Sequence, residues 1–378
     1  MNILVFSWRD PKHPKAGGAE QVMLEHFKGW IKAGHKVTHF SSKMPGLPNK
    51  EILDGIEIIR GGYQYLGVVI AGFFYYLKNR QRFDLVVDEF HGVPFFTPLY
   101  VKKPKIAVIQ EVARSVWFLN PLSWPLNWIV GLIGFFGEPL VFLFYRNVPF
   151  MTGSLSAKKD LIKMGISSRS ITVVQHGVIT REKAKSEKWE KAKEKTVVFL
   201  GVLSKDKGIE EAIRCFAILH QRNPTWNFWI VGRSETPQYG EKMAELVSKL
   251  GLSKKTKFWG YVSQEQKFEL LSKAHVLVNP SVHEGWGLVN IEANRMGTPV
   301  VAYKSPGLVD SVKDGKSGVI CLENTPKNLA TQVLKIMDDK SFYDSLCKGA
   351  LEWSSNFDWK KSSALSVSLI KKLAEDRT

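Results

Sequence analysis

The sequence predicts an α/β fold made of two Rossmann-like domains, and three observations support this prediction. Short apolar segments such as 2–7 and 196–200 are typical of buried parallel strands. Each is followed by a glycine-rich or polar loop that leads into an amphipathic helix. The length of 378 residues is too great for one ordinary core and suits two domains of about 150–200 residues each.

The first strand, 2–7, opens a β-α-β unit. A long loop from Trp8 ends at Gly17 and Gly18, a helix is predicted over 19–33, and the next strand covers 36–40. The unit lacks the spacing G-x-G-x-x-G and has serines where an acidic residue would close a dinucleotide site. This argues against a dehydrogenase with paired Rossmann domains.

Further strands of the N-terminal half end at polar residues. The strand 84–88 precedes His91, and the strand 105–109 precedes Gln110 and Arg114. Ser156 is the predicted cap of a helix over 157–164, and a strand over 171–175 ends this half. A lone histidine such as His91 is also compatible with a purely structural role.

Two uncharged, aromatic-rich stretches stand out, at 61–77 and 115–137. The second is 23 residues long, but prolines and asparagines interrupt it, and only twelve clean residues precede Glu138. We therefore expect a re-entrant or interfacial membrane segment, since tryptophans favour the headgroup region and basic residues are near. The alternative is a buried helix of the N-terminal domain.

The C-terminal half begins after a charged connector at 181–195. The strand 196–200 leads to Gly201, then to Lys205 and Lys207 before a helix over 209–221. The strand 226–231 is followed by Gly232 and Arg233, and the strand 257–259 by Tyr261 and Val262. A glycine turn before a helix offers free backbone N–H groups to phosphate, and the lysines add positive charge.

The stretch 276–302 is the most informative one. An apolar strand over 276–278 is followed by a turn with Glu284, Gly285 and Gly287, a helix over 288–296 with Glu292, and a strand over 300–302. Ligands of such sheets bind at the carboxyl ends of the strands, so both glutamates are candidates for ligand binding. The alternative is two ordinary solvated glutamates.

The composition narrows the classes of partner. The net charge is +17 and is spread, with +9 in residues 1–178 and +8 in the remainder. A spread basic surface suits an anionic membrane or phosphorylated ligands, and without a nucleic-acid motif we expect no nucleic acid. Three distant cysteines and an N-terminus that enters a strand directly predict a cytoplasmic protein without a secretory signal.

The spacing of Glu284 and Glu292 in HEGWGLVNIEANRMGTPVVA resembles the donor-sugar motif of retaining glycosyltransferases of family 4. The opening SWRDPKHPKAGGAEQ is similar to the acceptor-domain loop of that family. The resemblance implies a GT-B fold, with two Rossmann-like domains facing each other across a cleft. It implies an acceptor domain over 1–178, a nucleotide-sugar domain over 179–357, and a C-terminal helix at about 358–375 packed on the first domain.

The resemblance also implies roles for individual residues. Glu284 would contact the transferred sugar, Glu292 the ribose, and Lys207 the diphosphate, with Glu284 and Lys207 as the catalytic pair. The implied donor-binding set is Gly17, Gly18, Gly201, Lys205, Arg233, Tyr261, Val262, Gly285, Trp286, Gly287, Leu288 and Glu292. Gln110, Arg114 and His91 are candidates on the acceptor side. The chain departs from the family pattern at Val202, where arginine is usual, and at Gln110, where histidine is usual.

The resemblance implies a hexosyltransferase that uses a nucleotide-diphosphate sugar, and the aromatic stretches with the basic charge add the expectation of a lipid or lipid-linked glycan acceptor at the cytoplasmic membrane face. No D-x-D pair occurs in the sequence, so we expect neither a metal nor another cofactor. The retaining mechanism remains open between a carboxylate nucleophile and front-face attack. The departures at Val202 and Gln110 leave a second possibility, a GT-B protein that binds a nucleotide or glycan with little turnover.

Overall fold

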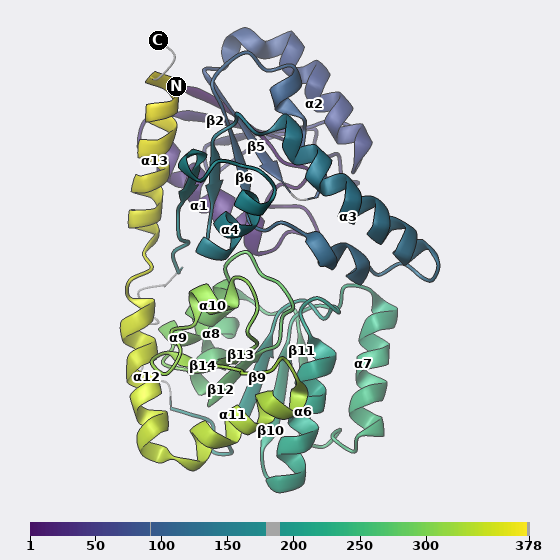
Figure 1. The fold of residues 1–378 in the computed structure, drawn as a ribbon, viewed down its shortest axis with the longest axis vertical. Coiled ribbons are helices and arrows are strands. Elements are labelled where there is room, and N and C mark those ends of the chain that lie inside the picture. The colour runs from purple at the N-terminus through teal and green to yellow at the C-terminus, as the bar shows by residue number, and fades with distance from the viewer. Residues whose placement is uncertain (91, 179–189, 376–378) are drawn as a thin grey trace. The chain divides into compact units, whose positions relative to one another are not determined.

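The computed structural model describes residues 1–90, 92–178 and 190–375, which form two compact units (Figure 1). The first comprises Met1–Arg114, Ile133–Gly177 and Asp358–Thr378, and the second comprises Ser115–Leu132 and Val178–Phe357. The sequence places 115–132 in the first domain. The structure groups them with the second unit, although none of them belongs to a hydrophobic cluster of either unit. His91 and 179–189 lie outside the described residues.

The first unit is built on an eight-stranded sheet in the order β3-β4-β2-β1-β5-β6-β7-β8. All neighbouring strands are parallel except β3 and β4. The strands are β1 (Asn2–Phe6), β2 (Lys36–Ser41), β3 (Lys50–Leu53), β4 (Ile56–Arg60), β5 (Leu85–Phe90), β6 (Lys105–Ile109), β7 (Phe150–Thr152) and β8 (Ile171–Val173). Their carboxyl ends therefore gather candidate residues at one edge.

Helices cover both faces of this sheet. They are α1 (Gly18–Lys32), α2 (Leu66–Asn79), α4 (Leu155–Lys163) and α13 (Trp359–Glu375). Helix α3 (Leu126–Phe144) begins in the part of the chain grouped with the second unit and ends in the first. Short 3-10 helices lie at Arg80–Arg82, Thr97–Leu99, Arg114–Leu119 and Ser168–Ser170. Val5 packs with α1 residues on one face, whereas Phe6 packs with α2 residues on the other. This alternation follows from the two-residue period of a strand.

The C-terminal helix α13 packs on α1, which confirms the expected return of the chain to the first domain. The two helices approach closely at Gly29, where an added Cβ would lie 2.6 Å from the Cβ of Ser363. The hydroxyl of Ser366 accepts a hydrogen bond from the Trp30 indole at 3.0 Å. Helix α1 thus has a glycine at the point where α13 crosses it.

The helix α2 is apolar on two sides. Val68, Gly72 and Tyr76 are buried against the sheet, whereas Leu66, Ile70, Phe74 and Leu77 are exposed along the opposite side. The helix is followed by Arg80 and Arg82. An exposed apolar stripe with a basic end is unusual for a helix whose other face already packs on a sheet.

The helix α3 is longer than the clean apolar stretch indicates, and it argues against the alternative of a buried helix. It continues through Glu138 and Pro139 to Phe144, and it is not a buried helix: only 17% of its apolar 18-residue span is buried. Glu138 is tolerated because its carboxylate accepts the backbone N–H groups of Ala113 and Arg114, at 2.8 Å each. Within the described residues, α3 is the helix that is long and apolar enough to span a membrane by length and composition.

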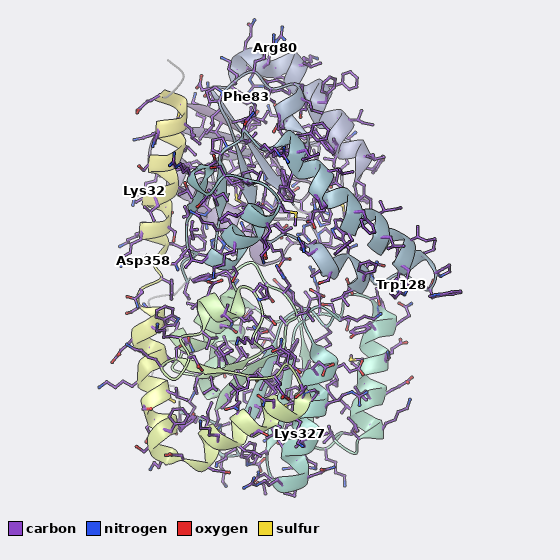
Figure 2. All side chains as sticks on the ribbon, in the orientation of Figure 1. Lys32, Arg80, Phe83, Trp128, Lys327 and Asp358 are labelled. Carbon is purple, nitrogen blue, oxygen red and sulfur yellow. The ribbon has the colours of Figure 1, made fainter. Side chains whose placement is uncertain are left out.

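Figure 2 shows the side chain of Trp128 projecting outward near the start of α3. The exposed apolar side chains of this helix and of the turn before it form a long surface: Leu122, Trp124, Leu126, Trp128, Ile129, Leu132, Ile133, Phe136, Leu140, Leu143 and Phe144. We call these residues the α3 apolar surface. So large an exposed apolar patch marks an interaction surface rather than ordinary solvent exposure.

The second unit contains a six-stranded parallel sheet in the order β11-β10-β9-β12-β13-β14. Its strands are β9 (Thr196–Leu200), β10 (Asn227–Val231), β11 (Thr256–Gly260), β12 (Val276–Asn279), β13 (Val300–Ala302) and β14 (Gly318–Ile320). Its helices are α6 (Ile209–Arg222), α7 (Pro237–Lys249), α8 (Gln264–Lys273), α9 (Leu288–Arg295), α10 (Leu308–Ser311), α11 (Pro326–Asp338) and α12 (Lys340–Ser354). One hydrophobic cluster joins both faces.

One helix begins differently from the prediction. Helix α4 starts at Leu155 and is capped by Ser154, whose hydroxyl accepts the backbone N–H of Ala157 at 3.0 Å. The sequence favoured Ser156 as the cap. Both serines have the right chemistry, and the extended backbone at Ser154 decides between them.

Acid is expected to destabilise the first unit through its buried histidines. Burial lowers the pKa of His26 and His39 to about 4 and that of His176 to about 3, below the ordinary value of 6.5. The unfolded chain therefore binds more protons once the pH falls below about 6.5, so stability is full above this pH and falls towards pH 4. We expect a loss of about 1–2 kcal/mol per histidine at pH 5.

Urea unfolding at pH 7.5 and pH 5.0 measures this effect. The variant His39→Phe removes one titrating ring and should show a smaller difference between the two pH values. Equal stability at both pH values would contradict the prediction.

Candidate active site

The loops after β10, β9 and β12 form the candidate site of the second unit. Because β9 lies between β10 and β12 in the sheet, the three loops leave neighbouring carboxyl ends. The backbone carbonyl of Asp206, in the loop after β9, accepts the backbone N–H of Val282 at 2.8 Å, which ties the loops after β9 and β12 together. The sheet order thus brings together residues about 80 positions apart in the sequence.

Glu284 is held by hydrogen bonds to its backbone and to its carboxylate. Its backbone N–H donates to the carbonyl of Pro306 at 3.2 Å, and its Oε1 accepts the hydroxyl of Ser281 at 3.0 Å. Gly307, at φ +76°, lies so close that a Cβ there would be 2.2 Å from the Glu284 carbonyl oxygen. The carboxylate is therefore oriented before any ligand binds.

Lys207 is the direct partner of Glu284. Its Nζ lies 3.0 Å from Glu284 Oε1 and 3.5 Å from Asp206 Oδ2, and the side chains of Lys207 and Glu284 are about one-fifth exposed, at 24% and 19%. The sequence predicted both residues in one site, and the structure places them in contact. This half-buried pair joins the loop after β9 to the loop after β12.

Two helix N-termini accompany the pair. Gly208 precedes α6 at φ +71°, and Gly287 precedes α9 at φ +82°, and neither helix has a side-chain cap. A Cβ at Gly208 would lie 2.3 Å from the carbonyl oxygen of Pro280. Both glycines are thus required by the backbone, and the uncapped N–H groups suit an anionic group such as a diphosphate.

The remaining cationic candidates differ in their placement. Arg233 belongs to the loop after β10, where its carbonyl accepts the N–H of Leu203 at 2.9 Å, so its backbone lies beside the Lys207 loop. Lys205 is exposed.

The second candidate carboxylate, Glu292, forms an ion pair with Lys267 of α8 at 2.5 Å, a partner that the sequence did not indicate.

The candidates for contact with the base and sugar divide into two groups. Tyr261 is 82% exposed after β11, whereas Val262 and Leu288 pack partly against the core. Trp286 is 2% exposed and packs edge-on against Phe357, with ring centroids 5.1 Å apart. The Trp286 ring therefore belongs to the core, and a donor contact of this residue would have to come from its backbone. Its backbone and the backbones of Gly285 and Gly201 remain at the predicted turns.

A buried amide network shapes the turn and was missed from the sequence. Asn279 donates to Asn290 at 2.8 Å, and Asn290 donates to Ser311 at 2.9 Å, all three side chains being buried. Asn279 also accepts the N–H of Ser281 at 3.2 Å. The sequence signal for this network was the presence of polar residues at the end of an apolar strand and inside a short helix.

The first unit holds the other candidates. Gly17 caps α1 and donates its N–H to Glu20 at 2.7 Å, and Gly18 is the first residue of the helix. The Oε1 of Gln110 lies 2.8 Å from the Nε2 of His176. Arg114 is exposed and has a backbone φ of +48°, and its backbone N–H donates to the Glu138 carboxylate. His91 lies outside the described residues. No cluster of three metal-ligating side chains occurs in the described part of the chain.

Comparison with known proteins identifies this second unit. Residues 180–353 match the family model "Glycosyl transferases group 1". This segment is a group 1 glycosyltransferase domain. A D-inositol 3-phosphate glycosyltransferase of Corynebacterium diphtheriae is 31% identical over 168 residues, which are 44% of this chain and 39% of that protein. The chain thus spans less than half the length of this relative.

Solved structures match the group 1 glycosyltransferase domain together with the rest of the chain. Sucrose-phosphate synthase from Thermosynechococcus elongatus has a TM-score of 0.80 at 21% identity, over 98% of each chain. Anabaena HepE in complex with UDP and glucose has a TM-score of 0.74 at 17% identity, over 98% of this chain and all of that chain. These matches confirm the predicted GT-B fold.

Proposed function

We propose that the chain transfers a hexose from a nucleotide-diphosphate sugar, with retention of anomeric configuration, to a lipid or lipid-linked glycan in cell-surface glycan synthesis. The Glu284–Lys207 pair between the uncapped N-termini of α6 and α9 carries this proposal. It combines an oriented carboxylate with an anion-binding surface. Similarity to a protein crystallised with UDP and glucose supports a nucleotide sugar as the donor.

In this proposal the diphosphate lies on the two helix N-termini, and Lys207 compensates the charge that grows on the leaving phosphate. Stabilisation of developing charge by fixed dipoles and cations is usually the largest catalytic contribution. Glu284 accepts hydroxyl groups of the transferred sugar, and Glu292 exchanges its lysine partner for ribose hydroxyls. Neither a metal nor another cofactor is required by these groups.

A thermal-shift screen over nucleotide sugars tests the donor site, because a bound ligand raises stability by mass action. Transfer with the donor that binds, followed by the anomeric configuration of the product, tests the reaction. Binding without turnover would instead support the second candidate, a nucleotide- or glycan-binding GT-B protein, which Val202 and Gln110 favour. No stabilisation by any nucleotide sugar would reject both.

The acceptor proposal rests on the exposed apolar residues of α2 and on the α3 apolar surface. A protein that acts on a lipid-linked substrate must reach the bilayer surface, and exposed apolar side chains next to arginines suit an anionic headgroup layer. Arg80 and Arg82 follow α2, and the chain carries a net charge of +17. We infer a peripheral position on the cytoplasmic membrane face.

Liposome flotation is expected to depend on the α3 apolar surface. Ile133 is 68% exposed and Phe136 is similarly exposed. Replacing both by glutamate should lower binding to anionic vesicles by about a hundredfold or more, since each buried apolar side chain contributes roughly 1.5–3 kcal/mol. Binding of the unaltered chain should also fall at high salt.

Leu322 provides the matched control, because it is 82% exposed in a loop of the second unit. The variant Leu322→Glu should bind vesicles like the unaltered chain. Equal binding to neutral and anionic vesicles, or no binding to either, would reject the membrane proposal.

A further inference from the structure

A cavity of about 510 Å³ lies at the amino-terminal edge of the sheet of the first unit. The parallel strands β1, β2 and β4 begin at this edge, so the cavity is on the side of the sheet opposite to the carboxyl ends. Its lining includes Asn2, Lys36, Thr38, Glu57, Arg82 and Phe83. Small-molecule sites of proteins have volumes of about 300–1,000 Å³, so the cavity is large enough for such a ligand.

The polar lining of the cavity lies on the face of the sheet that α2 covers. Phe40 of β2 and Ile59 of β4 pack with α2 residues on this face. Thr38 and Glu57 lie two positions before them, and alternate residues of a strand share a face. Thr38 and Glu57 are also directly opposite each other in the pairing of β2 with β4. The cavity is therefore bounded by these strands and by Arg82, in the short helix that follows α2.

Glu57 is an ionised carboxylate whose charge is already compensated. Its Oε1 lies 2.8 Å from Lys50 Nζ, and its Oε2 accepts the Thr38 hydroxyl at 2.9 Å and lies 3.3 Å from Arg82. Burial disfavours the charge, but the hydrogen bonds from Lys50 and Thr38 outweigh burial and lower the pKa of Glu57 below its ordinary value of 4.5. A carboxylate has about four acceptor positions, so Glu57 can still accept a ligand hydroxyl.

The positive charges at the cavity exceed this one carboxylate. Lys36 is exposed and forms no ion pair with any residue that the structure describes. The Arg82 side chain is 54% exposed, and its contacts with Glu57 at 3.3 Å and Asn79 at 3.5 Å leave most of its five N–H groups for a ligand. With Lys50, three cations surround Glu57, and this excess favours an anion. A phosphate suits the planar guanidinium fork of arginine.

The base of the cavity is apolar. Phe83 and Val37 line it and are 1% and 2% exposed. The Arg82 guanidinium lies over the Phe83 ring, 5.6 Å from its centroid, which places the cation beside this apolar base. Figure 2 shows Phe83 and Arg80 at the same end of the first unit. An apolar base with charged groups at its rim suits a carbon skeleton that carries both phosphate and hydroxyl groups.

We propose that this cavity binds a small phosphorylated ligand, with Lys36 and Arg82 on its phosphate and Glu57 on a hydroxyl group of the attached skeleton. A soluble hexose phosphate and the headgroup of phosphatidylinositol both have this chemistry. All of the lining residues belong to the first unit, and the candidate donor site belongs to the second. The inference is therefore independent of the proposed glycosyl transfer.

Calorimetric titration of the full chain with glucose 6-phosphate tests the inference, with glucose and inorganic phosphate as probes of the two halves of the ligand. Lys36→Gln and Arg82→Gln should each weaken binding of glucose 6-phosphate about 5- to 20-fold, because each removes a charge-assisted hydrogen bond to the phosphate. Glu57→Gln should lower the preference for glucose 6-phosphate over inorganic phosphate, because it weakens the acceptor for the hydroxyl group and spares the cations.

Arg80→Gln is the matched control. It removes the same charge from the same short helix as Arg82→Gln, but Arg80 does not line the cavity, so affinity should stay unchanged. Lys207→Ala, in the second unit, should also leave this affinity unchanged. Equal losses in Arg80→Gln and Arg82→Gln would indicate general surface charge and overturn the inference. A loss in Lys207→Ala alone would assign the ligand to the second unit and overturn it as well.

Flotation with phosphatidylcholine vesicles that contain phosphatidylinositol identifies the source of the phosphate. If Arg82→Gln lowers vesicle binding more than Arg80→Gln, and glucose 6-phosphate competes with the vesicles, the cavity binds the lipid headgroup. If glucose 6-phosphate binds without affecting the vesicles, the ligand is soluble. The inference is overturned if glucose 6-phosphate does not bind and the vesicles do not distinguish Arg82→Gln from Arg80→Gln.

Discussion

Glu284→Gln is expected to lower the rate of sugar transfer about 10²–10³-fold while the fold stays intact. The substitution removes the negative charge that the structure orients through Ser281 and pairs with Lys207. A charge-assisted hydrogen bond that tightens in the transition state contributes about 2–4 kcal/mol. Glutamine preserves the shape of the side chain and its place in the turn, so Tm should change little.

The measurement is kcat and KM with a donor that the unaltered chain turns over. Glu323→Gln is a suitable control, because Glu323 is an exposed glutamate in another loop of the same unit. Transfer by Glu284→Gln at nearly the original rate would show that the site has been assigned to the wrong carboxylate.

Lys207→Ala is expected to weaken binding of a nucleoside diphosphate, by an amount that depends on Arg233. If Arg233 also reaches the diphosphate, the loss should be about 1–3 kcal/mol, or about 5- to 150-fold in affinity. If Lys207 is the only nearby cation, binding should be nearly abolished, because a half-buried diphosphate would be left uncompensated. We favour the first result, since the Arg233 backbone lies beside the Lys207 loop.

A double-mutant cycle on Lys207 and Arg233, read by nucleotide affinity, distinguishes these results. A coupling energy near zero would remove Arg233 from the site. Lys205→Ala is the matched control, because Lys205 is exposed on the same loop. Val202→Arg, which restores the residue usual in the family, should tighten binding only if no other cation compensates.

The sequence predicted most strands of both sheets, because a short apolar segment that ends at glycine is seldom anything other than a buried strand. The bounds of β9 at Thr196–Leu200 and of β6 at Lys105–Ile109 are those expected from the pattern. The contact between Lys207 and Glu284 could also be anticipated, since both follow parallel strands whose ends share one edge.

The features that the sequence did not show have one physical origin, which is long-range packing. Trp286 stands between two glycines and looks accessible, but its ring packs against Phe357, far away in the sequence. The amide network of Asn279, Asn290 and Ser311 depends on three segments that meet only in the fold. Helix α3 continues past Glu138 because two backbone N–H groups bind its carboxylate, and no local pattern shows this.

The ion pair of Lys207 with Glu284 has a consequence for the resting protein. One ammonium group is shared by the carboxylate and, in the proposed function, by the diphosphate. In the structure the Glu284 carboxylate is neutralised by the Lys207 ammonium group, 3.0 Å away. In the proposed function, binding of the diphosphate would draw the lysine towards the phosphate oxygens and free the carboxylate for the donor sugar. The substrate itself would therefore switch on the group that acts on it.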